Sequence, residues 1–369
     1  MKILYAGNLV NGGFYHTKFS REAGIDMDLL MQKNPEPSSD PFCYDPNLKK
    51  YPEWIKFYDR KKTLWKLDIL RIMRNSKYDL IHSHVELPIF ARFSGKKFIA
   101  HTLGSDLKEM AFSNSLRGIL LRQAYKKAKI VIYSTPDQPL MLDRLKISNT
   151  IYLPLLRDLS VFKKTLNMEN EFFEKFIIFH PTTHIWKTKG NDILIQAFAM
   201  FLKIHPNSLL LMVDKGVDSK KSKNLINNLG IGTKIQFLSR LNSKELAKYY
   251  NLSHVIADQF IEPGLGGIGI EALYCEKPLI NSCPPNCYEG MHLENPPVID
   301  ANTPETISKE LEKLLNNNHR KNIGEKGRKW YLENLSPKTV VKKYSLLYDS
   351  ILNGESYKTI CKKFKTDFH

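Results

Sequence analysis

Residues 254–280 read HVIADQFIEPGLGGIGIEALYCEKPLI, and this stretch constrains what the rest of the chain can be. It begins with a short apolar run at residues 255–257, which predicts a β-strand. A loop with four glycines follows at residues 264–269, and apolar side chains then recur at helical spacing over residues 270–274. A second strand begins after Pro278, because proline ends the helix. Strand, glycine loop, helix and strand are typical of an α/β sheet domain.

The glycine loop and the helix behind it have the chemistry of a phosphate-binding site. Glycine lets the backbone approach a ligand closely, and a helix N-terminus presents unpaired N–H groups and the positive end of its dipole. Gly266 and Gly267 lie where the helix begins, so a phosphate group is attracted there. Glu271 lies one or two turns inside the helix, within reach of ribose hydroxyls beside the phosphates. The segment therefore predicts a nucleotide-binding site.

The same loop formally matches the dinucleotide-binding pattern G-x-G-x-x-G at Gly264, Gly266 and Gly269. That pattern also requires an acidic residue after the next strand, about 20 residues further on. Here the next strand ends in Asn281 and Ser282, and the pattern normally opens a domain. An NAD-dependent oxidoreductase therefore remains an alternative that rests on this motif alone.

The segment more closely resembles the donor-binding segment of GT-B glycosyltransferases in the large retaining family 4, the glycosyl transferases group 1. The family's Glu-Ala-hydrophobic helix start and its Gly-x-Pro-hydrophobic run resemble residues 271–273 and 277–280. The resemblance implies that Glu271 holds the ribose of a nucleotide-sugar. The family places seven residues between its two acids, whereas eight lie between Glu262 and Glu271. Since some relatives carry Asp-Gln before the loop, the first acid, which would bind the transferred sugar, is either Asp258 or Glu262.

A second motif lies at residues 180–198, HPTTHIWKTKGNDILIQAF. The family has a basic residue, then Lys-Gly about five positions later, then a helix that ends in Ala-Phe. Lys189 and Gly190 match this pattern directly, and His184 takes the position of the family's arginine. The resemblance implies that these three residues contact the donor and that the Lys189 charge stabilises the departing diphosphate. A histidine at the arginine position would give up a permanent charge and a bidentate hydrogen bond.

The first half of the chain carries two further matches. Gly12 and Gly13 follow an apolar strand at residues 2–6. The resemblance implies that the loop after this strand contacts the donor phosphates and the acceptor. A plain strand-to-helix turn explains these glycines equally well. Residues 101–107, HTLGSDL, resemble the family's His-Gly-Ser-Asp-Leu, although Leu103 stands directly before the glycine. On this resemblance His101 is a candidate catalytic residue, and a structural histidine at a strand end is the alternative.

A chain of 369 residues suits two domains of ordinary size. The resemblance implies the GT-B architecture, in which two doubly wound Rossmann-like α/β domains face a cleft. We expect the following parts: an acceptor-side domain at residues 1–160, a nucleotide-sugar-binding domain at 161–335, a helix at 336–352 that crosses back to the first domain, and a frayed basic tail at 353–369.

The formal net charge is +17 and is densest in the first half, where residues 1–160 hold 26 Lys/Arg and 16 Asp/Glu. Residues 49–77 alone hold ten basic and three acidic residues, with aromatic residues such as Trp54, Phe57 and Trp65 between them. Residues 63–74 have the pattern of a basic amphipathic helix, which predicts contact with an anionic membrane surface. A solvated helix that packs its other face on the sheet is the alternative. No motif supports nucleic-acid binding.

The sequence predicts no metal site. Asp26 and Asp28 form a D-x-D pattern, but this pattern lies inside the strand predicted at residues 25–31 rather than in a loop. The five cysteines lack zinc spacing and indicate free thiols in a reducing compartment. No apolar run is long enough to span a membrane, and residues 2–7 indicate a first strand rather than a signal peptide. We therefore expect a cytoplasmic protein, with possible contact at the inner membrane face through residues 49–77.

The resemblance implies a retaining hexosyltransferase that moves a sugar from a UDP- or GDP-linked donor to an acceptor hydroxyl. No cofactor beyond the nucleotide-sugar substrate is expected, because a lysine and a helix dipole supply the positive charge. The acceptor would be a sugar, a lipid-linked sugar or a polysaccharide, in envelope polysaccharide or glycolipid synthesis. A GT-B-fold sugar-nucleotide epimerase or phosphorylase would share the same site and remains an alternative.

Overall fold

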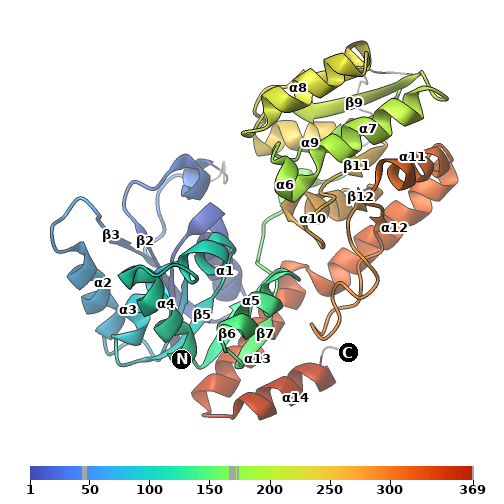
Figure 1. Cartoon of the computed structure of the whole chain (residues 1–369). Helices are drawn as coiled ribbons and strands as arrows, with labels where there is room; N and C mark the ends of the chain where they lie inside the picture. Colours follow the sequence, from blue (N-terminus) through green and yellow to red (C-terminus); the bar gives the residue numbers. More distant parts are fainter. Residues whose placement is uncertain (44–47, 166–171, 173, 368–369) are drawn as a thin grey trace. The chain divides into compact units, whose positions relative to one another are not determined.

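The computed structural model describes residues 1–43, 48–165, 172 and 174–367. Contacts within the chain divide it into two compact units (Figure 1). Each unit is built on its own parallel sheet, so the predicted pair of α/β domains is confirmed. Unit 1 comprises Met1–Asp158, Gly290–His292 and Leu335–His369, and unit 2 comprises Leu159–Glu289 and Leu293–Asn334.

Unit 1 contains a seven-stranded sheet in the order β3-β2-β1-β4-β5-β6-β7. The strand order reverses beside β1, which pairs with both β2 and β4, and ligands of such sheets bind at the carboxyl ends of strands near this point. The strands are β1 (Lys2–Ala6), β2 (Asp26–Gln32), β3 (Ile55–Tyr58), β4 (Leu80–His84), β5 (Lys97–His101), β6 (Ile130–Tyr133) and β7 (Thr150–Tyr152). The α-helices are α1 (Gly12–Glu22), α2 (Trp65–Arg74), α3 (Leu87–Arg92), α4 (Leu116–Lys127), α5 (Gln138–Arg144), α13 (Pro337–Leu352) and α14 (Tyr357–Asp367).

Helix α13 completes the core of unit 1 from the far end of the sequence. Tyr344 and Tyr348 are fully buried in the same apolar cluster as Ile3, Leu80 and the other strand residues. Helix α13 therefore belongs to unit 1, although it follows unit 2 in the sequence.

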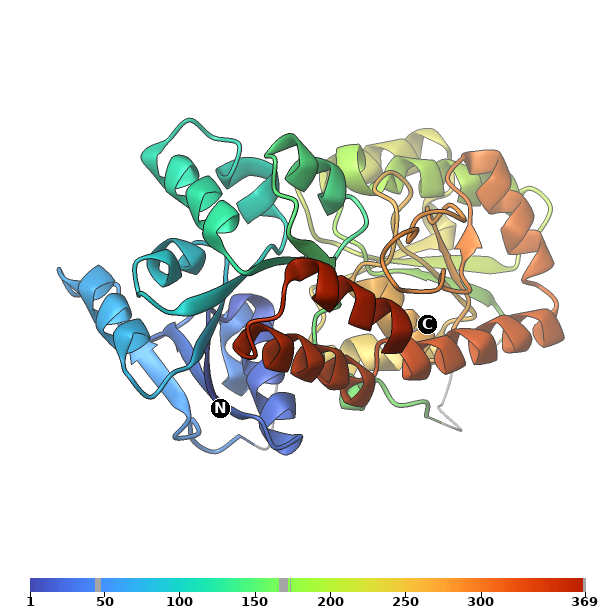
Figure 2. The same ribbon diagram turned by 90° about the horizontal axis from the view of Figure 1, so that it is seen from below.

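Helix α14 corrects the expectation of a frayed tail at residues 353–369. Residues 357–367 form a helix that lies beside α13 (Figure 2). Ile360 and Phe364, one turn apart, belong to the unit 1 core and expose only 2% and 1% of their surface. Burial of two large apolar side chains holds this basic helix on the domain, at roughly 1.5–3 kcal/mol each.

Unit 2 contains a six-stranded parallel sheet in the order β10-β9-β8-β11-β12-β13. The strands are β8 (Phe176–His180), β9 (Ser208–Val213), β10 (Ile235–Leu238), β11 (Val255–Ala257), β12 (Leu279–Asn281) and β13 (Ile299–Asp300). The α-helices are α6 (Trp186–Lys189), α7 (Asn191–Leu202), α8 (Ser219–Asn228), α9 (Ser243–Leu252), α10 (Gly267–Tyr274), α11 (Pro304–Lys313) and α12 (Asn317–Asn334).

The sheet of unit 2 brings the two sequence motifs together. Strands β8 and β11 are parallel neighbours, with Val255 opposite Ile178 and Ile256 opposite Phe179. Since both strands run in the same direction, the segments that follow them leave the sheet at the same edge. One segment leads to Lys189 and the other to the glycine loop. Within the ranges that the structure describes, no helix combines the length and apolar character needed to cross a membrane.

Candidate active site

Hydrogen bonds from its backbone N–H groups fix the glycine loop, which leads directly into α10. Gly264 has φ +94°, a conformation that favours glycine, and its N–H donates to Ser282 O at 2.9 Å. The N–H of Leu265 donates to the phenol oxygen of Tyr288 at 2.8 Å. Gly266 is the N-cap of α10 and supplies no side chain to the first turn. The start of α10 therefore keeps the anion-attracting character that the sequence predicts.

Asp258 lies beneath this loop rather than beside it. Its carboxylate is 2% exposed and accepts a hydrogen bond of 2.7 Å from Thr182 Oγ1. A Cβ atom at Gly266 would stand 3.4 Å from its other oxygen. Burial, partly offset by Thr182 and Lys189, raises the pKa of Asp258. A carboxylate in this position lies against the glycine loop and is almost closed to solvent.

Lys189 and Glu262 lie together at the end of α6. Lys189 Nζ donates to Gln259 Oε1 and lies 3.7 Å from Glu262 Oε2. The main chains are joined as well, because Phe260 N donates to Lys189 O at 2.9 Å and Glu262 N to Thr188 O at 3.2 Å. The Glu262 side chain keeps 33% of its surface exposed. Of the two alternatives for the first acid, Glu262 is thus the accessible one.

Gly190 makes this junction possible. It has φ +66° and ends α6, while α7 begins at the next residue. A Cβ atom here would stand 3.1 Å from the Cβ of Phe260 and 3.2 Å from Cγ1 of Ile261. The role of Gly190 is therefore structural: it forms the turn between α6 and α7 and lets this turn approach the segment that contains Phe260 and Ile261 closely.

Glu271 has a partner that sequence reasoning missed. The phenol of Tyr250, at the end of α9, donates to Glu271 Oε2 at 2.9 Å. Tyr250 is fully buried, and burial together with the nearby Glu271 carboxylate raises its pKa well above the usual value. The phenol therefore stays protonated and fixes one carboxylate oxygen. Only tertiary packing brings α9 and α10 together, so no sequence signal indicated this pair.

His184 is enclosed by protein and exposes no surface for a contact with the donor. Its side chain is fully buried, and Nδ1 lies 2.7 Å from Ser222 Oγ on α8. Its backbone is fixed too, because His184 N donates to Lys215 O at 2.7 Å and Asp218 N donates to His184 O at 3.0 Å. Burial lowers the pKa of His184, which favours a neutral imidazole. We therefore replace the expected donor contact by a structural role in the β8–α6 turn.

Two of the three candidate residues of unit 1, His101 and Gly13, also have structural roles. His101 is fully buried, with Nδ1 3.2 Å from His82 Nε2 and Nε2 2.8 Å from Ser134 Oγ. A side chain so enclosed does not touch a substrate, so the catalytic expectation for His101 is not supported. Gly13 packs against the backbone, because a Cβ atom there would clash with Gly7 O, whereas Gly12 has open space around it.

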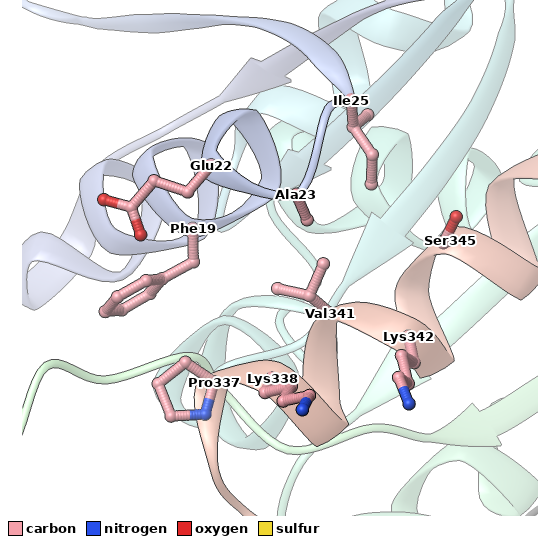
Figure 3. Close-up of a pocket in the computed structure, with 9 residues that line it drawn as sticks. All are labelled: Phe19, Glu22, Ala23, Ile25, Pro337, Lys338, Val341, Lys342 and Ser345. Atoms are coloured by element: carbon pink, nitrogen blue, oxygen red, sulfur yellow. The ribbon is translucent and has the colours of Figure 1, made fainter.

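Unit 1 carries an open groove of about 590 Å³ between α1 and α13 (Figure 3). Apolar side chains such as Phe19 and Val341 form its walls, and Lys338 and Lys342 lie along one side. None of the predicted site residues is among the nine residues that line it. The groove is therefore separate from the chemistry gathered in unit 2.

Comparisons with known proteins match the part of the chain that contains this site. Residues 163–330 match the family model of the glycosyl transferases group 1, which covers most of unit 2 and the whole of the site around Lys189 and Glu271. An uncharacterized glycosyltransferase of Haemophilus influenzae is 27% identical over 194 residues, which are 51% of this chain and 52% of that protein. The alpha-monoglucosyldiacylglycerol synthase of Acholeplasma laidlawii is 24% identical over 291 residues, 67% of this chain and 70% of that protein.

Solved structures show the same fold. HepE of Anabaena, in complex with UDP and glucose, has a TM-score of 0.72 at 14% identity. The match covers 95% of this chain and 100% of the HepE chain. Sucrose-phosphate synthase of Thermosynechococcus elongatus has a TM-score of 0.65 at 15% identity. The match covers 96% of this chain and 100% of the synthase chain. The expected GT-B fold is confirmed by these neighbours.

Proposed function

Because this chain is a glycosyltransferase of the GT-B fold with a group 1 domain, we propose that it transfers a sugar from a nucleotide-sugar to an acceptor hydroxyl with retention at the anomeric carbon. The observation that carries this proposal is the meeting of Lys189, Glu262 and the start of α10 in one unit. Lys189 and Glu262 are 3.7 Å apart, and the glycine loop that follows Glu262 opens α10. A cation, a helix N-terminus and an acid are what a sugar diphosphate requires.

Lys189 and α10 would act on the leaving group. As the bond between the anomeric carbon and the diphosphate oxygen breaks, negative charge develops on that oxygen. The ammonium of Lys189 and the positive end of α10 stabilise this charge better in the transition state than in the bound donor. Lys189 keeps 26% of its side chain exposed, so a diphosphate can reach it.

The two acids would hold the two sugars of the donor. Glu271, fixed by Tyr250, accepts hydrogen bonds from the ribose hydroxyls. Glu262, next to Lys189, accepts them from hydroxyls of the transferred hexose. We retain UDP or GDP as the nucleotide, and the complex of HepE with UDP and glucose supports UDP among them.

The proposed acceptor is a lipid-linked sugar, glycolipid or polysaccharide of the cell envelope, reached from the cytoplasmic side of the membrane. The name of the Acholeplasma laidlawii relative, a synthase of a glucosylated diacylglycerol, supports a lipid acceptor. Exposed basic residues of unit 1 support docking on an anionic surface. They lie in α2 and the turn before it and include Lys61, Lys62, Lys66, Arg71 and Arg74.

The apolar part of this docking surface differs from the expectation. Trp54 and Phe57 pack against the unit 1 core, and Trp65 stacks on Tyr58. The apolar side chains that reach the surface at α2 are Leu64 and Leu67, which are 62% and 55% exposed. Together with the surrounding cations they give α2 the character of a helix that lies on a membrane interface.

The direct test is a product assay. The purified chain is incubated with UDP- or GDP-linked hexoses and with lipid or oligosaccharide acceptors, and products are identified by mass spectrometry and by NMR of the new linkage. We expect an α-linked product from an α-linked donor. Inversion would overturn the proposed stereochemistry. Epimerised donor would favour an epimerase, and sugar 1-phosphate formed from the oligosaccharide and added inorganic phosphate would favour a phosphorylase. Thermal stabilisation by NAD alone would favour the oxidoreductase.

A further inference from the structure

Gln259 occupies the centre of the site, although neither of the two motifs assigns it a role. Its side chain is buried, with 6% of its surface exposed. The amide oxygen accepts from Lys189 Nζ, and the amide nitrogen donates to Glu262 O at 2.9 Å and to Gly264 O at 3.2 Å. An ammonium group only donates and a carbonyl only accepts, so the orientation of the amide is fixed by its partners.

The backbone of Gln259 is tied into the same loop. Ser282 N donates to Gln259 O at 2.8 Å, and Gly264 N donates to Ser282 O at 2.9 Å. The carbonyl of Gly264 also accepts from Asn281 Nδ2 at 3.0 Å. The loop from residue 259 to residue 264 is therefore closed on itself and held to β12, and it carries Glu262 at its turn.

We propose that Gln259 is a positioning residue for glycosyl transfer, which sets the Lys189 ammonium against the glycine loop. One planar amide holds the cation with its oxygen and the loop with its nitrogen, so the distance between the two is fixed by a rigid group. This inference rests on the proposed role of Lys189 toward the diphosphate. It adds the group that keeps the lysine in place when no donor is bound.

The neutrality of the amide is part of the role. Lys189 already lies 3.7 Å from the Glu262 carboxylate. A glutamate at position 259 would place a second negative charge on the ammonium and would turn a carboxylate oxygen toward two backbone carbonyls. The positive charge available to the diphosphate would fall, and the loop would lose both of its amide donors. Glutamine orients the cation without neutralising it.

The test is a double-mutant cycle between Gln259 and Lys189. We expect Gln259→Glu to lower kcat about tenfold or more with a smaller change in the donor KM. In a Lys189→Ala background, the same substitution should lower kcat by a clearly smaller factor, because the part of its effect that acts through the ammonium is absent and only the loss of the loop donors remains. Gln196→Glu, at an exposed position of α7, introduces the same charge in the same unit and should leave kcat unchanged.

Two results would overturn the inference: wild-type kcat in Gln259→Glu, or the same loss of kcat in both backgrounds. Should Gln259→Glu not fold, Gln259→Met keeps the length of the side chain without a charge and is subject to the same cycle. Failure of the underlying function is distinguishable, since Lys189→Ala alone would then retain full transfer activity.

Discussion

Tyr348 of α13 and His82 of β4 share a buried hydrogen bond of 2.8 Å between the phenol oxygen and imidazole Nδ1, although 266 residues separate them in sequence. The same phenol oxygen lies 2.6 Å from His16 Nε2 on α1. On the other side, His82 Nε2 lies 3.2 Å from His101 Nδ1 on β5. A continuous hydrogen-bonded chain thus links the crossover helix to α1 and to two central strands.

The protons along this chain have a single consistent order. Ser134 Oγ donates to the backbone carbonyl that follows β7, so it accepts from the Nε2–H of His101. His101 Nδ1 then accepts from the Nε2–H of His82, and His82 Nδ1 accepts from the phenol of Tyr348. The phenol oxygen accepts from the Nε2–H of His16. His82 and His101 must therefore be neutral, because each ring uses its Nδ1 as an acceptor.

The first prediction is that acid destabilises unit 1. Burial lowers the pKa of His16 and of His84 to about 3, and that of His82 and His101 well below the usual 6.5. Below pH 6.5 the unfolded chain binds protons that the folded chain does not. The contribution of these buried, neutral histidines to the free energy of unfolding is therefore fully present above pH 6.5. It is lost as the pH falls toward 3, by roughly 1.4 kcal/mol per histidine and pH unit. Thermal melts from pH 7.5 to 5 should show a falling Tm, with a shallower slope for a folded His82→Gln variant, and a Tm independent of pH would contradict the account.

The second prediction concerns the Tyr250–Glu271 pair. Tyr250→Phe removes the donor at 2.9 Å from Glu271 Oε2, so the phenol no longer fixes this carboxylate oxygen. A hydrogen bond to a charged group contributes about 1.5–3 kcal/mol, so we expect UDP or GDP to bind roughly ten- to hundredfold more weakly. Calorimetric titration measures this, and Tyr249→Phe on the neighbouring position is the control. Glu271→Ala should weaken binding at least as much in a folded protein, and unchanged affinity in both variants would remove Glu271 from the site.

The third prediction separates binding from chemistry at Lys189. Because the charge on the leaving diphosphate develops in the transition state, Lys189→Ala should lower kcat by two or more orders of magnitude and change the donor KM less. Steady-state kinetics with a saturating acceptor measure both constants. A higher KM with normal turnover would show that the lysine binds donor uniformly and does not assist departure.

The fourth prediction is that transfer survives EDTA. Asp28, the second acid of the D-x-D pattern, is 3% exposed in β2 and accepts from Tyr78 and Lys77, so it does not belong to an open loop. Activity measured before and after dialysis against EDTA should agree within twofold. Complete loss that manganese restores would require a metal site elsewhere.

The fifth prediction tests the membrane surface at α2. Changing Lys61, Lys62 and Lys66 to Glu should abolish sedimentation with anionic liposomes at low salt, since each cation near such a surface contributes about 1 kcal/mol. Wild type should bind anionic but not neutral vesicles and should be released by high salt. The same charge change at exposed positions of unit 2, Lys220, Lys309 and Lys326, is the control. Binding of wild type to neither vesicle type would leave α2 a solvated basic helix.

Sequence reasoning predicted the backbone of this protein better than its side chains. The strand, glycine loop and helix at residues 254–280 are where the pattern predicts them, because glycine, proline and apolar spacing act locally. The expectation that His101 and His184 contact the substrate rests on their positions in the two family motifs, and both residues lie near strand ends. Whether a side chain there points outward or into the domain depends on the neighbouring helices, which a sequence pattern does not contain.

The same limit explains the tail and the first acid. Ile360 and Phe364 have the spacing of one helix face, but the lysines around them concealed a helix whose burial depends on α13. Glu262 and Asp258 could not be separated by spacing, because the difference between them is depth: one carboxylate is at the surface and the other lies beneath the loop.

The contribution of α13 and α14 to the unit 1 core sets an order of events during synthesis. A ribosome makes β1 to β7 first, yet residues 335–369 of the same domain emerge only after all of unit 2. Until then the core positions of Tyr344, Tyr348 and Phe364 are unfilled. The sheet of unit 1, which is synthesised early, therefore has an incomplete hydrophobic core. Unit 2 is continuous in sequence apart from Gly290–His292, which belong to unit 1, so it can complete its core before unit 1 does. The domain that is translated first is thus the one that finishes folding last.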